Sequence, residues 1–229
     1  MYPFKIIHTR SGFTLIEILI ALLLVGILLT TLFAASRGLL EQIQPVTRQT
    51  RIGQMAAAAL NRFQVDLSQV VISMPPAYRR PQFNTDPDPY RIVGQNDTAL
   101  GKTLAQLQFA SLGHFPETTG RQEGVARIVY YVSETQSEEK LLRRSDRLFP
   151  YGEFTPQPGD PVLCRHVDEF AVFFSGADGE EVESWDSESE SSRFSTPPAV
   201  RIVLTLKEDD RTWRYESYHQ LTTFRKAAK

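Results

Sequence analysis

The sequence predicts an α+β fold, in which one long N-terminal helix precedes an antiparallel β-rich domain. Nearly all of the strongly apolar sequence lies in a single run, residues 13–35. An amphipathic helical pattern follows this run as far as residue 72. From residue 104 onward, short β-like runs follow one another without an intervening helical pattern, which is typical of antiparallel sheets. We therefore expect a membrane anchor followed by a soluble domain.

The composition of the 229-residue chain sets few limits on its function. Hydrophobic residues make up 41% and charged residues 23%, as in ordinary proteins with a packed core. The formal net charge of −2 gives no reason to expect a nucleic-acid partner. The single cysteine, Cys164, excludes a disulfide within the chain, so the fold must depend on burial.

The apolar run is long enough to cross a membrane. Its length of about 23 residues exceeds the roughly 20 that span a bilayer core as a helix. Lys5 and Arg10 precede the run, and the next base is Arg37. The positive-inside rule therefore favours an N-terminus in the cytoplasm and a C-terminal domain on the other side.

A small residue stands before this run rather than after it. Conventional secretory signals carry their small-residue cleavage site beyond the apolar region. Here Gly12 lies directly before Phe13. A cut between them would remove a basic leader, residues 1–12, and keep the whole transmembrane part, residues 13–35. The alternative is a plain single-pass anchor that is never cut.

Glu17 is the ionisable residue within the apolar run. A carboxylate in a membrane helix costs on the order of 2.5–3.5 kcal/mol, and such residues are usually functional. Cleavage after Gly12 would create an α-amine at Phe13, close to the depth of Glu17. The amine of one subunit would then neutralise Glu17 of its neighbour. This pairing would make the carboxylate a determinant of assembly.

The segment at residues 12–17, GFTLIE, and the apolar run after it resemble the class III signal of type IV pilins and type II secretion pseudopilins. The resemblance implies that a prepilin peptidase/methyltransferase cleaves between Gly12 and Phe13 and methylates the new amine of Phe13. It also implies that Glu17 is the assembly carboxylate.

Beyond residue 35 an apolar stripe recurs at spacings of three and four, as on one face of a helix. Pro75 and Pro76 end the pattern. The soluble, amphipathic part of the helix is therefore expected over residues 36–72, packed on a globular domain at residues 73–229. The stripe consists of Leu39, Leu40, Ile43, Val46, Thr50, Gly53, Ala56, Leu60, Phe63, Leu67 and Val70.

The globular domain is expected to begin with a long loop and continue as strands. Residues 73–101 are rich in proline and lack periodicity. After them, runs rich in β-branched and aromatic residues are bounded by turn signals, which predicts strands. The expected strands are residues 104–109, 125–132, 140–144, 162–167, 170–175, 200–206 and 212–219.

Segments in the second half of the chain resemble the J-type minor pseudopilin of type II secretion in order and spacing. They are residues 126–132, 141–144, 167–174, 179–185 and 197–204. The resemblance implies a pseudopilin fold and a non-enzymatic structural subunit, at the tip of a secretion pseudopilus that supports export of folded proteins across the outer membrane. The implied partners are the I- and K-type minor pseudopilins and the major pseudopilin. The implied location is the inner membrane, with the globular domain in the periplasm. The close alternative is a minor pilin of a type IV pilus, which would share the N-terminus.

Cys164, His166 and Asp168 alternate along an expected strand and could share one face. A thiol, an imidazole and a carboxylate together could form a nucleophilic site or hold zinc. No accompanying motif supports such chemistry, so a buried cysteine beside polar surface groups is the preferred interpretation. We therefore expect no catalytic residue, cofactor or metal ligand. A membrane-tethered hydrolase or metal-binding domain remains the alternative.

Residues 178–190 carry several acids and no base. A solvated, mobile loop is expected there. Clustered carboxylates can bind calcium, but the loop pattern of a calcium site is absent. The arginines Arg79, Arg80, Arg143, Arg144 and Arg147 are expected at the surface, and Trp185 and Trp213 in the core or at a sheet edge.

Overall fold

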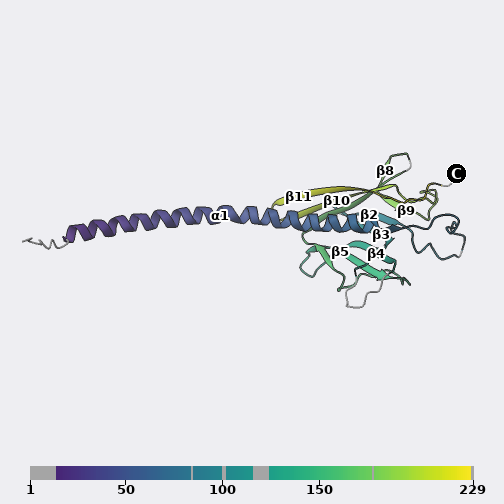
Figure 1. The fold of residues 1–229 in the computed structure, drawn as a ribbon, viewed down its shortest axis with the longest axis horizontal. Helices are drawn as coiled ribbons and strands as arrows, with labels where there is room; N and C mark the ends of the chain where they lie inside the picture. Colours follow the sequence, from purple (N-terminus) through teal and green to yellow (C-terminus); the bar gives the residue numbers. More distant parts are fainter. Residues whose placement is uncertain (1–13, 84, 100–101, 116–123, 177, 228–229) are drawn as a thin grey trace, which may run out of the picture. The chain divides into compact units, whose positions relative to one another are not determined.

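The computed structural model describes residues 14–83, 85–99, 102–115, 124–176 and 178–227, with the side chains of residues 35–47 and 99 excepted. A helix, α1 (Leu15–Ser68), is followed by β-strands (Figure 1). The chain divides into two compact units, Met1–Arg51 and Ile52–Lys229. The α+β class expected from the sequence is confirmed.

The strands of the second unit belong to one sheet. Its main path runs β11-β10-β7-β3-β4-β5-β6, while β1 and β2 pair with β3, β8 with β7, and β9 with β2. Neighbours are antiparallel, except that β3 and β7 run parallel where Leu104 faces Phe170. The strands are β1 (Val70–Val71), β2 (Val93–Ala99), β3 (Lys102–Ser111), β4 (Ala126–Glu134), β5 (Lys140–Leu148), β6 (Val162–Cys164), β7 (Val167–Ser175), β8 (Glu181–Val182), β9 (Ser184–Asp186), β10 (Ala199–Glu208) and β11 (Arg211–Gln220).

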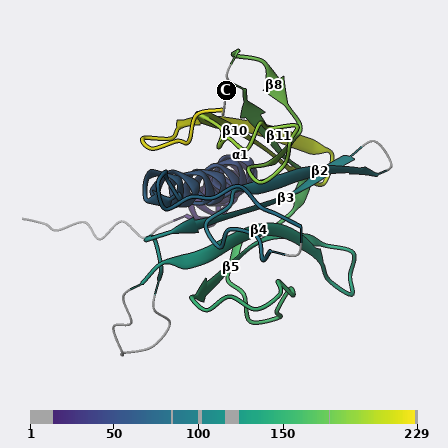
Figure 2. The same ribbon diagram turned by 90° about the vertical axis from the view of Figure 1, so that its right-hand side faces the viewer.

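The sheet curves around residues 52–68 of α1. Figure 2, which looks along the helix, shows β10 and β11 on one side of it and β4 and β5 on the other. Buried helix residues recur at spacings of three and four: Ile52, Ala56, Ala59, Phe63 and Leu67. The Phe63 ring stacks on Tyr130 of β4 at 3.8 Å and lies 5.7 Å from Phe170 of β7. The predicted packing of the helix stripe is confirmed for Ala56, Phe63 and Leu67, whereas Leu60 is only partly buried.

The helix ends at Ser68, four residues before the expected end. Val70 and Val71 leave the helical pattern because they pair with Ser111 and Ala110 of β3. The β-branched side chains favour this short strand. The expected helix boundary at residue 72 was therefore wrong, because the chain leaves the helix at residue 68 to pair with β3.

Two strand predictions also need correction. The expected strand at residues 162–167 is interrupted, because His166 has a positive φ of 58° and ends the extended path between β6 and β7. β2 lies inside the expected loop. Its residues are poor strand formers, but Gly94 leaves room for the Phe174 ring, where any Cβ would overlap that ring. Packing on the core determines β2 more than strand propensity does.

Candidate functional site

The first candidate site is the start of α1, where Thr14 and Glu17 form a capping box. The Thr14 backbone N–H and its hydroxyl both donate to Glu17 Oε2 at 3.2 Å. In return, the Glu17 backbone N–H donates to Thr14 Oγ1 at 3.3 Å. This exchange satisfies donors that the first turn of a helix leaves free. Gly12 and Phe13 lie outside the described residues.

Apolar side chains surround this capping box. The 20-residue segment Leu15–Ala34 has the length and composition of a membrane span, and none of it is buried. Glu17 itself is exposed. In the described part of the chain, no basic side chain is paired with it. The capping box was not expected from the sequence. The spacing Thr14-x-x-Glu17 would have indicated it.

The second candidate site lies at the other end of α1, where Asp66 is fully buried. Arg144 of β5 approaches both of its oxygens, with Nε 2.7 Å from Oδ2 and Nη2 3.2 Å from Oδ1. The Tyr130 hydroxyl donates to Oδ2, and Arg62 contacts Oδ1. A carboxylate that is bound on every side in this way connects the helix to β4 and β5.

The ionisation of this cluster follows from its contacts. Burial lowers the pKa of Arg144, but the hydrogen bonds and the charge of Asp66, together with the charge of Asp146, outweigh burial in sum and raise that pKa. Burial and the adjacent Asp66 carboxylate hold the pKa of Tyr130 well above its ordinary value. Arg144 therefore stays charged and Tyr130 stays neutral, and the cluster acts as a structural clamp. Arg144, which we expected at the surface, is only 4% exposed.

Arg144 also pairs with Asp146, which lies two residues further along β5 and therefore on the same face of the strand. Its Nη1 lies 2.6 Å from Asp146 Oδ2, and His114 Nδ1 lies 2.7 Å from Asp146 Oδ1. Burial opposes the charged form of Asp146, but the contacts with His114, the Phe115 backbone N–H and Arg144 lower its pKa. Arg144 and Arg62 both donate to the Gly113 carbonyl. The loop after β3 is thereby tied to the helix.

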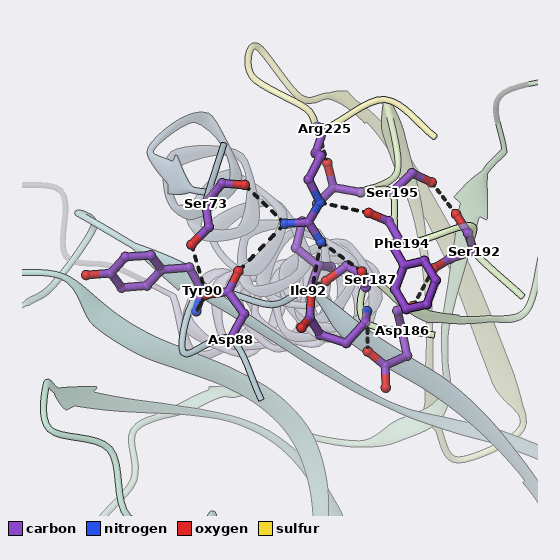
Figure 3. A network of polar contacts seen from close by, with 12 residues as sticks. Ser73, Asp88, Tyr90, Ile92, Asp186, Ser187, Ser192, Phe194, Ser195 and Arg225 are labelled. Atoms are coloured by element: carbon purple, nitrogen blue, oxygen red, sulfur yellow. Dashed lines mark hydrogen bonds and ion pairs between the residues drawn. The ribbon is translucent and has the colours of Figure 1, made fainter. Parts of the chain in front are cut away.

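A third network surrounds Arg225 near the C-terminus (Figure 3). The guanidinium donates to the carbonyl oxygens of Phe194, Ser73 and Ser187 at 2.7–3.0 Å. It also pairs with Glu188 at 3.1 Å and lies 3.4 Å from the centre of the Tyr78 ring. One arginine thus holds together the loop after α1, the acidic segment and the C-terminal residues.

The acidic segment is more ordered than we expected. It contains β8 and β9, the Trp185 ring is buried, and its Nε1 donates to the Ser195 carbonyl at 3.0 Å. Glu181 forms a two-point pair with Arg201 of β10 at 2.6 and 2.9 Å. The expectation of a solvated loop is confirmed for residues 178–184, which are exposed, but it was wrong for residues 185–189, where Trp185 and Ser187 are buried. A partner such as Arg225, distant in sequence, gives no local signal.

Cys164, His166 and Asp168 do not form a common site. Cys164 is buried in the core, and burial raises the pKa of its thiol to about 12. His166 lies between Glu139 and Glu208, at 3.6 and 3.9 Å, while Asp168 pairs with Lys102. Among the described residues, no cluster of three potential ligands is arranged to hold a metal. The three side chains face different partners, which leaves no support for a hydrolase or a metal-binding domain.

Comparisons with known proteins give two matches. The family model described as "Type II secretion system (T2SS), protein J" matches residues 37–215, and the model of the "Prokaryotic N-terminal methylation motif" matches residues 7–33. The first match covers most of the second unit, including the Asp66 clamp. The second match covers Gly12, Phe13 and Glu17. A search of curated proteins found no relative.

Proposed function

The chain belongs to the protein J family of the type II secretion system, a family of minor pseudopilins, and we propose that Glu17 and the amine of Phe13 are the groups through which it joins the pseudopilus. An apolar N-terminal helix anchors the chain in a membrane. On this proposal, a prepilin peptidase cuts between Gly12 and Phe13 and methylates Phe13. The methylation-motif match over both residues supports this step.

The observation that carries the proposal is an exposed carboxylate in an apolar helix. Both capping bonds use Oε2 of Glu17, which leaves Oε1 available for the amine of a neighbouring subunit. Within a bilayer an unpaired carboxylate is costly, and a cation from another chain removes that cost. The cost of the unpaired carboxylate therefore favours the stacking of subunits, because stacking brings the amine of a neighbour to Glu17.

The proposed location is the inner membrane, with the N-terminus in the cytoplasm and the globular unit in the periplasm. Lys5 and Arg10 before the span support this orientation. The proposed partners are the I- and K-type minor pseudopilins, which would form the filament tip with this chain, and the major pseudopilin. The match over residues 37–215 favours the secretion pseudopilus over a type IV pilus, since the methylation motif is common to both. We assign the chain no catalytic role.

Intact mass spectrometry of the protein purified from membranes tests the processing step. We expect a chain that begins at Phe13 and carries one added methyl group. A chain that begins at Met1, or after Ala35, would contradict the proposed cleavage. Gly12→Val serves as the variant in which the leader should remain, because a branched side chain replaces the small residue before the cut.

Co-purification tests the proposed position in the filament. Residues 36–229 and the soluble parts of the I- and K-type proteins from the same secretion system are expressed together. We expect a stable ternary complex in size-exclusion chromatography. Independent elution of all three proteins would contradict the tip assignment while leaving the processing result unaffected.

A further inference from the structure

Two loops of the globular unit face each other across a groove beside β4. Residues 86–89 and Arg91 line one part of it and residues 149–154 another, together with Gln108 of β3 and Arg127 of β4. The groove has a volume of about 880 Å³. A smaller hollow of about 310 Å³, next to β5, shares Arg127 and Pro150 with it.

Arg127 faces a like charge across the sheet. In the pairing of β4 with β5 it lies directly opposite Arg147, and like charges in opposite positions destabilise a sheet. Arg147 is neutralised by Asp160, 3.1 Å away. The described contact of the Arg127 guanidinium is the ring of Tyr151, whose centre lies 5.5 Å away. Its Nε is buried and has no hydrogen-bond partner among the described residues.

The acids that line the groove do not neutralise Arg127. Asp88 accepts hydrogen bonds from Ser73 and Tyr90 and faces Arg225. Asp86 and Glu153 are exposed to solvent. The pKa of Arg127 is lowered, first by burial and then by the nearby Arg91 and Arg147. The groove therefore contains a half-buried cation that forms no described ion pair with the acids that line the same groove.

The rim of the groove is apolar. Phe149 is 63% exposed and lies edge-on to Tyr151, with ring centres 5.4 Å apart. Tyr151 is held in place because its hydroxyl donates to the Val125 carbonyl at 2.9 Å. Three prolines, Pro87, Pro89 and Pro150, also line the groove. A small anion would neutralise Arg127 but would leave these apolar surfaces uncovered. A peptide with an acidic residue would neutralise Arg127 and also cover the apolar surfaces.

We propose that this groove receives an Asp or Glu side chain from an extended segment of a neighbouring pseudopilin subunit. The carboxylate binds the guanidinium of Arg127 from the groove, and apolar residues of the same partner segment cover Phe149. An arginine fork and a carboxylate form the strongest class of charged hydrogen bond. The inference rests on the proposed assembly of this chain with other pseudopilins.

Site-directed photocrosslinking in cells that carry the complete secretion system tests the proposal. Benzoylphenylalanine replaces Phe149 in the full chain, and crosslinked peptides are mapped by mass spectrometry. We expect a crosslink to another pseudopilin within a few residues of an Asp or Glu. Arg127→Ala should lower its yield by roughly tenfold or more. Arg211→Ala, an exposed arginine on the distant edge strand β11, should leave it unchanged.

A charge exchange completes the test. Arg127→Glu should abolish the crosslink, and a change of the mapped partner acid to arginine should restore it in that background. A crosslink to the chain's own residues 116–123, to a second copy of the chain or to lipid would overturn the proposal. So would a yield that is independent of Arg127, or no crosslink at all.

Two measurements separate this proposal from folding and from processing. The melting temperature of Arg127→Ala should be unchanged or higher, because the change removes a cation that repels Arg147. A melting temperature that falls in parallel with the crosslink would assign Arg127 a purely structural role and overturn the proposal. Intact mass reports processing at Phe13, so a defect there is distinguished from failure of the groove.

Discussion

Helix α1 carries two carboxylates whose surroundings differ in almost every respect. Asp66 is fully buried and contacts Arg144, Arg62 and Tyr130, which come from the helix and from two strands. Glu17 is exposed among apolar side chains, and its described bonds come from Thr14, three residues away. The first carboxylate is neutralised by its own chain, whereas none of the described residues neutralises the second.

The difference separates folding from assembly. A buried charge that is fully paired contributes to one specific arrangement of its own chain, and loses that role if any partner is removed. A charge that faces lipid without a partner raises the free energy of the isolated subunit in the membrane and so favours association. We infer that Asp66 serves the fold of the globular unit and that Glu17 serves the filament.

The largest expected effect is on assembly, in Glu17→Ala and Glu17→Gln. Both variants should be inserted and cleaved normally, because removal of a charge makes insertion easier. Both should nevertheless lose most of their crosslinking to neighbouring subunits and most of the secretion activity of the system. The measurements are crosslinking in membranes and a secretion assay, and Glu17→Asp should lie between the variants and the wild type.

Wild-type assembly and secretion in Glu17→Ala would contradict the inference. This outcome would be understandable for a subunit at the filament tip, because no subunit ahead of it would supply a cation to Glu17. Unfolding of the globular unit is the matched control. Glu17→Gln should leave it unchanged, since Glu17 has no described contact with that unit.

The converse change is Asp66→Asn, which should destabilise the globular unit by about 3–5 kcal/mol, because Arg144 and Arg62 lose the carboxylate that they share and the buried Arg144 keeps only Asp146 as a described counter-charge. Urea unfolding followed by fluorescence is the measurement, since Trp185 and Trp213 both lie in the globular unit. The double variant Asp66→Leu, Arg144→Met should recover a large part of the loss, because it removes both charges together. A loss below about 1 kcal/mol in Asp66→Asn, the range of exposed pairs, would show that the clamp is not essential to the fold.

The sequence predicts the Glu17 side of this comparison better than the Asp66 side. An acid inside an apolar run is visible in the sequence alone, as are the long helix and most long strands. Arg144 was expected at the surface, because its pairing with Asp66 joins residues that are 78 positions apart. The network around Arg225 could not be predicted for the same reason, because its carbonyl partners are distant in the sequence. Local patterns report neighbours on a helix or strand, whereas buried charge pairs depend on the completed sheet.

The apolar contacts of the helix were predictable because their period is local. Phe63→Ala should destabilise the globular unit by about 3–5 kcal/mol, through loss of burial and the cavity that remains. The ring is fully buried and stacks on Tyr130, which also donates to Asp66. The same fluorescence-detected urea unfolding measures the change. An unchanged midpoint would show that this face of the helix serves a partner helix rather than the core.

The smallest expected effect concerns a third way to accommodate an ionisable group, which is to keep it neutral. His219 on β11 is half-buried, with Nε2 2.6 Å from Ser217 Oγ, and the described residues form no ion pair with it. Burial lowers its pKa below the ordinary value of 6.5. The folded chain therefore binds this proton less readily than the unfolded chain does.

The sign of the resulting pH dependence follows from linkage. Above about pH 6.5 the histidine is neutral in both states, and the contribution to stability is complete. As the pH falls below that value the unfolded state gains a proton first, so stability decreases until the pH passes the lowered pKa of the folded state. A pKa difference of one corresponds to about 1.4 kcal/mol.

His219→Gln keeps a hydrogen-bonding group but cannot titrate, so the stability of this variant should decrease less than that of the wild type between pH 7.5 and 5. His114 and His166 are present in both proteins, and the difference between the two urea-unfolding curves therefore reports His219 alone. If the stabilities of the two proteins depended on pH in the same way, His219 would be as easily protonated in the folded state as in the unfolded state. Its burial on β11 would then not keep it neutral.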